Sequence, residues 1–404
     1  MKIKKSVFTK IIPQYVLIYC IAATSGSLLF VRNIKLFEYL IIGVFVLLTI
    51  YKKSNRLQYV WHILIILFVA VMFVHLLSGG IGIDSWLLYS CQILSVYCAF
   101  FVDKENFLNR YVKMVSVLAA ISIVAWLMRF FVPNILDLLL RSRIELYNKS
   151  HTYTTTYKGL LFFTYSLDTR NCGIYSEPGR YQAILQGALF IVLFCQKLVR
   201  FEKRKSIFAT AVLILTILTS QSTTGYIMLL AMVVLFLFTR RENTNAQIKK
   251  AIIVLVFLGA TYLLYNLSKY GVNSILGRIV FGKFQDTDIS DMSSSGGARL
   301  RMIELCLNQI MLKPWGVGLI QTQGNIVAAG VLRFLAAVGV IPGFLTMLWI
   351  FLPVKRTFSG YVELVAFVFI YLYLGLAQSY VFYSGLLVIP IVLHEINKCS
   401  VEEI

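Results

Sequence analysis

Apolar runs long enough to cross a bilayer recur along the whole chain of 404 residues. The most apolar parts of these runs include LIIGVFVLLTIY from Leu40, WHILIILFVAVMFV from Trp61 and MLLAMVVLFLF from Met228. A membrane-spanning helix needs roughly 20 mainly apolar residues, because hydrocarbon offers no water to unpaired backbone groups. The chain is 59% hydrophobic and only 14% charged. The sequence therefore predicts an all-α, polytopic integral membrane protein and excludes a soluble two-domain enzyme.

We predict about twelve transmembrane helices, and eleven is the alternative because the second and the last run are short. The predicted spans are 11–31, 36–51, 58–77, 83–102, 111–132, 182–197, 206–220, 223–239, 251–267, 326–353, 362–378 and 380–394.

Basic residues predict the orientation, because Lys and Arg accumulate in short cytoplasmic loops. With the N-terminus inside, more than half of the 38 Lys and Arg fall in such loops. Both termini are then cytoplasmic, and two large loops lie on the outer face. This predicts an organisation into 1–132 (five spans), 133–181 (first large loop), 182–267 (central spans), 268–325 (second large loop, with an interfacial helix) and 326–404 (C-terminal spans).

The formal net charge of +20 is explained by this orientation and not by nucleic acid. Arginine outnumbers lysine on the predicted outer face, while lysine dominates inside. Because the guanidinium group binds phosphate through two parallel hydrogen bonds, we interpret the bias as an anion site. The alternative is contact with lipid headgroups. The predicted ligand-binding residues are Arg143, Arg170, Arg180, Arg278, Arg299 and Arg301.

The stretch Ser290–Leu319 is the most polar long passage of the chain. Leu300, Ile303 and Leu307 recur at helical spacing, and polar residues such as Arg301 and Glu304 lie between them. This pattern is typical of a helix that lies in the membrane interface. We interpret it as a platform that holds cationic groups over a cavity.

The first large loop contains a second predicted interfacial helix, Ile135–Tyr147, followed by a stretch rich in Tyr and Thr. Glu177 and Arg180 directly precede a span. We predict that Glu177 contacts a sugar hydroxyl and Arg180 a phosphate, while the alternative is a plain surface turn that starts a helix. Glu177 is the first candidate for a catalytic base, and His151 is the second.

The turn Thr219–Gly225 carries six hydroxyl or amide residues and no charge between two apolar spans. Either Ser220, Ser222 and Thr223 line a polar cavity, or the turn is a short exposed hairpin. Cys172 and Cys306 fall in the two large loops, so they either pair or remain small packing residues. No His pair has metal-ligand spacing, so we expect no metal.

Together these motifs resemble the O-antigen and capsular polysaccharide polymerases, the Wzy-type proteins, which share a superfamily with the O-antigen ligases. The resemblance is carried by Glu177-Pro178-Gly179, by the turn Thr219–Gly225, and by Arg299 about fifteen residues before Pro314-x-Gly316-x-Gly318. It covers roughly residues 170–345.

The resemblance implies a GT-C-like, metal-independent glycosyltransferase of the bacterial inner membrane. Such enzymes join oligosaccharide units carried on undecaprenyl pyrophosphate at the periplasmic face, and they work with a flippase and a Wzz-type chain-length regulator. The family's loop arginine corresponds to Arg299, with Arg301 adjacent. The resemblance implies no cofactor.

Two departures favour a polymerase over a ligase. The ligases carry an arginine in the serine-rich turn, which Gln221–Thr224 lacks, and a histidine where Gly324 precedes Asn325. The alternatives are a ligase that transfers glycan to the lipid A core, a flippase or exporter of lipid-linked oligosaccharide, and an assembly protein without chemistry.

Overall fold

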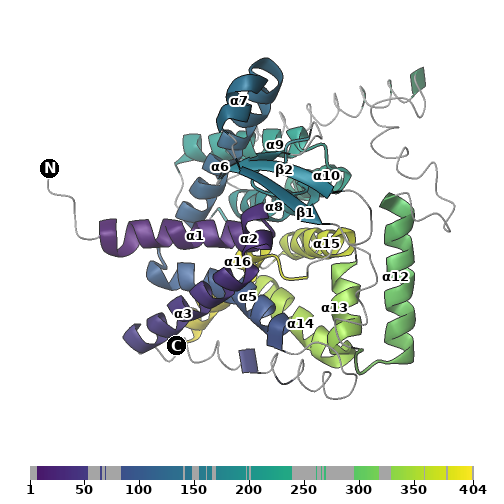
Figure 1. Ribbon diagram of the computed structural model, residues 1–404. Coiled ribbons are helices and arrows are strands. Elements are labelled where there is room, and N and C mark those ends of the chain that lie inside the picture. The colour runs from purple at the N-terminus through teal and green to yellow at the C-terminus, as the bar shows by residue number, and fades with distance from the viewer. Residues whose placement is uncertain are drawn as a thin grey trace.

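Helices form most of the chain in the computed structural model (Figure 1). The structure describes residues 7–52, 64–65, 69, 83–139, 142–147, 154–160, 162–165, 170–196, 198–199, 202–238, 261, 265, 268–269, 295–317, 329–358, 360–378 and 381–402. The N-terminal part of the chain forms a π-helical turn, η1 (Val7–Ile11), and the helices α1 (Ile12–Thr24), α2 (Leu28–Arg32), α3 (Ile34–Lys52), α5 (Ile83–Val102), α6 (Phe107–Phe131) and α7 (Pro133–Leu139). The rest of the chain forms the helices α8 (Pro178–Phe194), α9 (Lys203–Thr219), α10 (Thr223–Phe238), α12 (Ser295–Leu312), α13 (Gly330–Val338), α14 (Val340–Thr357), α15 (Tyr361–Ala377) and α16 (Ser384–Glu402).

Three described helices are long and apolar enough to cross a membrane: Ile34–Tyr51, Phe107–Phe131 and Val340–Thr357. Shorter apolar helices are Trp86–Val102, Thr223–Phe238, Tyr361–Ala377 and Ser384–Ile396. Helices occupy each predicted span that the structure describes, whereas 58–77 and 251–267 lie almost wholly outside the described residues. The helical membrane character is thus supported, and the number of crossings stays a prediction.

The centre of the bundle is α8, in which every residue except Arg180 is buried. It packs against α6, α9, α10, α15 and α16. Because other helices surround α8, its residues from Ala183 to Phe194 are apolar on nearly every side of the helix. Arg180 therefore interrupts an otherwise buried helix in its first turn.

A three-stranded antiparallel sheet lies in the first large loop, with order β1-β2-β3. The strands are Ser142–Tyr147, Thr154–Leu160 and Phe163–Tyr165, and Tyr147 pairs with Thr154. The predicted interfacial helix Ile135–Tyr147 is therefore wrong beyond Leu139, where α7 ends. Its second half alternates polar and apolar residues and finds a partner strand rich in Thr, a residue type that favours strands.

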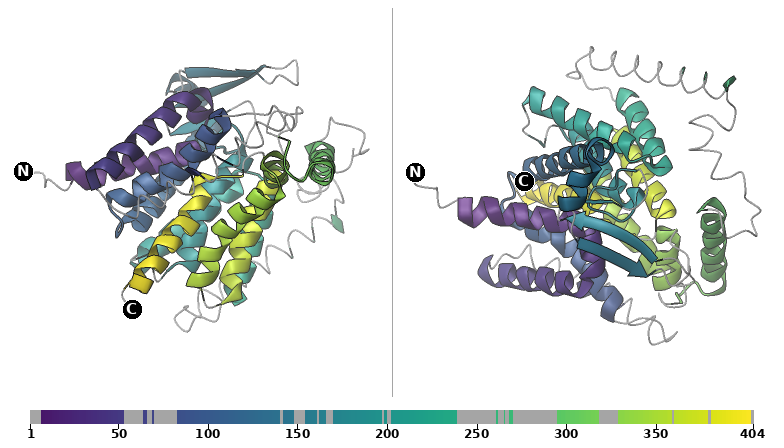
Figure 2. Two further views of the ribbon diagram at one scale, coloured as in Figure 1. Left: turned by 90° about the horizontal axis from the view of Figure 1, so that it is seen from below. Right: turned by 45° about the horizontal axis from the view of Figure 1, so that its top comes forward.

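The sheet covers one end of the helix bundle, which we call the sheet end (Figures 1 and 2). Thr164 of β3 donates its backbone N–H to the carbonyl of Gly173 at 2.6 Å, which joins the sheet to the loop before α8. At this end Thr24 of α1 and Ser384 of α16 lie 2.9 Å apart between their hydroxyl oxygens. The first residues of α1 and the last residues of α16 point to the opposite end (Figure 2).

Two hydrogen bonds hold the turn after α12 against the break between α13 and α14. The predicted span 326–353 is interrupted at Gly339, whose φ is 92°, so this stretch forms two helices. The turn after α12 packs on this break: Val340 donates its N–H to the Pro314 carbonyl at 2.9 Å, and Val317 donates to the Ala336 carbonyl at 2.9 Å. We call these two hydrogen bonds the clasp.

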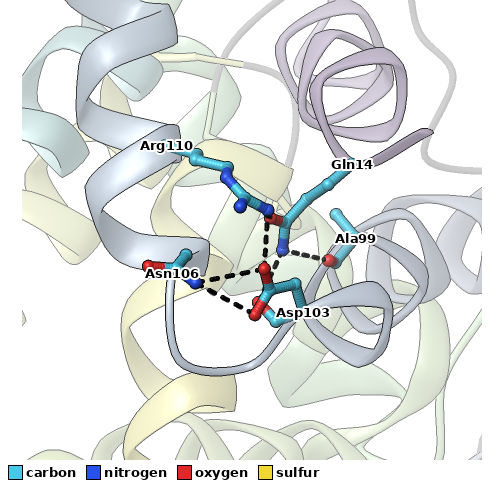
Figure 3. Close-up of polar contacts among 5 residues, drawn as sticks. All are labelled: Gln14, Ala99, Asp103, Asn106 and Arg110. Carbon is cyan, nitrogen blue, oxygen red and sulfur yellow. Dashed lines mark hydrogen bonds and ion pairs between the residues drawn. The ribbon is translucent and has the colours of Figure 1, made fainter. Parts of the chain in front are cut away.

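At the end opposite the sheet, polar side chains tie α1 to the turn between α5 and α6 (Figure 3). Gln14 donates to the carbonyls of Ala99 at 2.9 Å and Asp103 at 2.7 Å. Arg110 forms an ion pair with Asp103 at 2.9 Å and donates to the side-chain carbonyl of Gln14. Asn106 donates to both carboxylate oxygens of Asp103.

Replacing Arg110 with Ala should lower the free energy of unfolding by about 1–3 kcal/mol, because Asp103 and Gln14 then lose a shared charged partner. The two charged side chains are only 15% and 11% exposed, so water replaces that partner poorly. Denaturant unfolding of the detergent-solubilised protein measures the change. Arg204→Ala, at an exposed position at the start of α9, is the matched control. Equal stability of the two variants would contradict the account.

Candidate functional site

Two sequence motifs about forty residues apart meet at the sheet end, at the start of α8. Gln182 donates its side-chain N–H to the Ser220 hydroxyl at 2.7 Å, and Gln186 donates to the Gly225 carbonyl at 3.1 Å. Because Gln182 and Gln186 are four residues apart, both lie on one face of α8. The serine-rich turn therefore packs against the first turns of the helix that begins with Glu177-Pro178-Gly179-Arg180.

The serine-rich turn is buried and is not an exposed hairpin. Ser220 is fully buried, Ser222 and Thr224 nearly so, and the exposed Gln221 adopts a left-handed backbone with φ 48°. The Ser220 hydroxyl donates to the Ile217 carbonyl at 2.7 Å, and the Ser222 hydroxyl accepts the Gly225 N–H at 3.3 Å. The hydroxyls thus end α9 and begin α10, which starts at Thr223.

Asn171 fixes the loop before α8 to its surroundings. Its side-chain amide donates to the hydroxyls of Ser122 and Thr219, each at 3.1 Å, and its backbone N–H donates to the Thr219 carbonyl at 3.1 Å. Tyr181 donates its hydroxyl to Ser122 at 3.1 Å as well. Arg170, which is half-buried, therefore lies directly beside the serine-rich turn.

Glu177 is the N-cap residue of α8, yet its side chain makes no capping hydrogen bond. The residue has an extended backbone and is half-buried. Arg180 follows in the same turn and is also half-buried. A carboxylate and a guanidinium group therefore lie at the N-terminal end of a helix that is otherwise buried. An ordinary surface turn would not be half-buried in this way.

Gln378 completes the site from the end of α15. It is 4% exposed, and its side-chain amide lies against Gly179. Its backbone carbonyl accepts the N–H of Gly330 at 2.8 Å, so the start of α13 is fixed at the same place. We call Glu177, Gly179, Arg180 and Gln378, together with the serine-rich turn behind them, the α8 site.

The second predicted group of arginines lies on α12. The helix Ser295–Leu312 forms in the predicted stretch, and Met302 and Cys306 pack with Ala329 against α13. Arg301 is exposed, outside this contact. Arg299 is the fifth residue of the same helix.

The helix α12 crosses the direction of α14 and does not run alongside it (Figures 1 and 2). Met311, Leu312 and Trp315 are 72%, 82% and 66% exposed, and Arg301, Glu304 and Lys313 are exposed as well. A crosswise helix with exposed apolar and charged positions is typical of the membrane interface. This arrangement supports the predicted interfacial helix.

Burial raises the pKa of the Cys306 thiol, and the nearby Arg333 guanidinium opposes this effect. Cys172 and Cys306 are both free and buried, so the disulfide considered from their positions does not form.

Of the three other predicted residues, one lies on the sheet and two lie outside the described residues. Arg143 lies on β1, where it pairs in register with Lys158 of β2. His151 and Arg278 lie outside the described residues. In the part of the chain that the structure describes, no three His, Cys, Asp or Glu side chains are placed to share a metal ion.

No protein-family model, curated protein or solved structure matches the chain.

The sequence interpretation missed Gln378, Asn171 and Ser122. The available signal was weak: Gln378 is an amide in a short turn between two spans, and Ser122 is a hydroxyl within an apolar run. Polar residues at such positions need hydrogen-bond partners within the protein, and they often mark a functional site.

Proposed function

We propose that the protein is a Wzy-type, metal-independent membrane glycosyltransferase that polymerises oligosaccharide repeat units carried on undecaprenyl pyrophosphate. The observation that carries the proposal is the contact between the start of α8 and the serine-rich turn, through Gln182 and Ser220. Both motifs are among those that resemble the Wzy-type proteins. Two ordinary surface turns would not need to be buried against each other.

The reaction follows from the charges at the α8 site. A hydroxyl of the acceptor sugar attacks the anomeric carbon of the donor, a new glycosidic C–O bond forms, and the bond to the pyrophosphate oxygen breaks. Glu177 takes the hydroxyl proton, because its carboxylate is not occupied as a helix cap. Arg180 and Arg170 stabilise the negative charge that grows on the pyrophosphate, with Arg299 and Arg301 contributing from α12.

The proposed location is the bacterial inner membrane, with about twelve spans in a GT-C-like arrangement and the sheet end in the periplasm. Both ends of the described chain lie opposite the sheet, which fits cytoplasmic termini. The substrates are then lipid-linked donor and acceptor units, and the partners are the flippase and the chain-length regulator of the same system.

Deleting the gene and separating the cell-surface glycan on a gel tests this function. The proposal predicts a lipid core that carries a single repeat unit and no ladder, with the ladder restored by the wild-type gene. Long lipid-linked polymer outside the cell, with none on the core, would instead identify a ligase.

Buried carboxylates favour one second candidate, a flippase of lipid-linked oligosaccharide. Glu38 of α3 and Glu395 of α16 are 1% and 3% exposed within the helical bundle, and ionisable residues in membrane spans often mark transport pathways. Glu38 forms an ion pair with Lys35 at 3.1 Å, which also suits a structural role. Single lipid-linked units that accumulate on the cytoplasmic side of the deletion strain would favour the flippase.

A further inference from the structure

Three aromatic rings join α5, α13 and the residues just before α16 at the sheet end. The Tyr89 ring packs edge-on against the rings of Phe334 and Phe382, with centroids 5.5 and 5.1 Å apart. The rings of Phe334 and Phe382 in turn lie 5.3 Å from each other. These two phenylalanines are almost fully buried, whereas Tyr89 keeps 8% of its surface exposed. Because edge-on contacts favour one ring orientation, the position of the Tyr89 hydroxyl is fixed.

Arg333 places a positive charge beside this tyrosine. The residue lies half-buried in the first turn of α13, directly before Phe334. Its guanidinium group is close enough to the Tyr89 hydroxyl and to the Cys306 thiol for its charge to act on both. The Arg333 side chain therefore lies where α5, α12 and α13 meet.

Gln92 adds a buried amide to the same face of α5. It is 1% exposed, and neither its Nε2 nor its Oε1 atom has a hydrogen-bond partner among the residues that the structure describes. Gln92 and Tyr89 are three residues apart, so they are neighbours, and a helical side chain covers the turn before its own. A buried amide without a partner is costly, so this one indicates a ligand that supplies the partner.

The start of α13 is held in place by a strained residue. Ala329 is fully buried and has a φ of 58°, a left-handed conformation that is rare for alanine. Its N–H donates to the Leu376 carbonyl at 3.0 Å, and the N–H of Gly330 donates to the Gln378 carbonyl at 2.8 Å. Strain of this kind clusters at ligand sites, where the surroundings fix the position of the backbone. Because the Gln378 side chain lies against Gly179, α13 starts directly beside the α8 site.

We infer that the acceptor glycan binds where α5, α12 and α13 meet, with Tyr89, Gln92 and Arg333 contacting its sugar hydroxyls. We call these three residues the acceptor site. Amide and phenol groups both donate and accept hydrogen bonds, as a sugar hydroxyl does, whereas an ionised phosphate mainly accepts them. The set therefore favours a sugar over a bare anion. Because the Gln92 amide is covered, its side chain changes rotamer when the sugar binds.

The location of the acceptor site suits the proposed reaction, on which this inference rests. Attack from the side opposite the leaving group requires donor and acceptor on two sides of the anomeric carbon. The α8 site, assigned to the leaving pyrophosphate, contacts the first turn of α13 through Gln378 and Gly330. Arg333 follows Gly330 by three residues and lies towards α5 and α12. The first turn of α13 therefore lies between the two sites.

Ligand-observed NMR titration of the purified protein in nanodiscs tests the acceptor site. The probe is the lipid-free repeat-unit oligosaccharide, released by mild acid from the lipid-linked units of the host, and inorganic pyrophosphate is titrated in parallel. Tyr89→Phe should weaken oligosaccharide binding about fivefold, because it removes one hydroxyl and keeps the ring packing. Arg333→Gln should weaken it about tenfold, because it removes a charged donor. Both variants should bind pyrophosphate like the wild type.

Gln92→Leu distinguishes a ligand contact from a structural role. It should weaken oligosaccharide binding about fivefold, yet without the sugar it should be at least as thermally stable as the wild type, since it removes an unpaired buried amide. Tyr97→Phe is the matched control, because Tyr97 is 1% exposed about two turns further along α5. It should bind the oligosaccharide with wild-type affinity.

Three results would overturn the inference. The first is wild-type oligosaccharide affinity in either Tyr89→Phe or Arg333→Gln. The second is a wild-type protein that does not bind the oligosaccharide. The third is loss of pyrophosphate binding in Arg333→Gln, which would move this arginine to the donor.

The two proposals fail separately. Loss of the glycan ladder on gene deletion, together with oligosaccharide binding that does not depend on Arg333, would reject the acceptor site and keep the polymerase. Arg333-dependent binding in a protein whose deletion leaves the ladder intact would keep a glycan site and reject the polymerase.

Discussion

Arg180→Gln should lower the rate of polymer formation by about 10²–10³-fold, the usual loss when one group that stabilises transition-state charge is removed. The expected effect is large because the proposed mechanism assigns Arg180 to the charge that grows on the leaving pyrophosphate, and Arg180 is the one residue of α8 that is not buried. Glutamine keeps most of the side-chain length and part of the hydrogen bonding, so the loss of charge dominates. The rate is measured from glycan chain length over time in cells or in reconstituted membranes.

Arg204→Gln is the matched control, because Arg204 is exposed at the start of α9, the far end from the serine-rich turn. It should polymerise at the wild-type rate. Arg180→Lys should retain more activity than Arg180→Gln and less than the wild type, since lysine keeps the charge without the planar fork. Full activity in Arg180→Gln, with wild-type expression, would remove this residue from the mechanism.

Gly339→Ala should destabilise the protein by about 2–4 kcal/mol and release α12 from the break between α13 and α14. A non-glycine residue at φ 92° is strained, which costs about 1–2 kcal/mol. The new Cβ would also lie 2.5 Å from the Trp315 carbonyl oxygen, so the turn must move and the clasp is lost. Each lost hydrogen bond costs about 0.5–1.5 kcal/mol.

Labelling of Cys306 reports the release directly. Cys306 is 1% exposed between α12 and α13 in the intact structure, and its raised pKa reduces the reactive thiolate further. Maleimide labelling followed by mass spectrometry should be slow in the wild type and fast in Gly339→Ala. Gly43→Ala is the control, since a Cβ there meets nothing within 4 Å. Equally slow labelling in both variants would show that the clasp does not hold α12.

The helices could be predicted because length and hydrophobicity alone determine them. The range of α5 matches the predicted span 83–102, and α12 follows from apolar residues at helical spacing. The strands could not be predicted in the same way, since Ile135–Tyr147 contains enough apolar residues to suggest a helix. Its second half becomes a strand only because 154–160 provides a partner, and pairing over that distance is not visible in a local pattern.

The candidate site was predicted in part for a similar reason. Glu177, Arg180 and the serine-rich turn attract attention because charged or polar residues stand beside apolar spans. Gln378 does not, since a single amide in a turn is ordinary until the helix packing places it against Gly179. Which arginines cooperate also depends on packing, and Arg301 on α12 is exposed while Arg180 lies at the entrance of α8.

The most direct test of the central claim uses purified protein in nanodiscs and lipid-linked repeat units extracted from the deletion strain. Mass spectrometry then follows the length of the glycan and the release of undecaprenyl pyrophosphate. The account predicts chains of two and more repeat units, with one undecaprenyl pyrophosphate released for each new glycosidic bond and almost no product from Arg180→Gln. Repeat units that stay single in the presence of folded wild-type protein would contradict it.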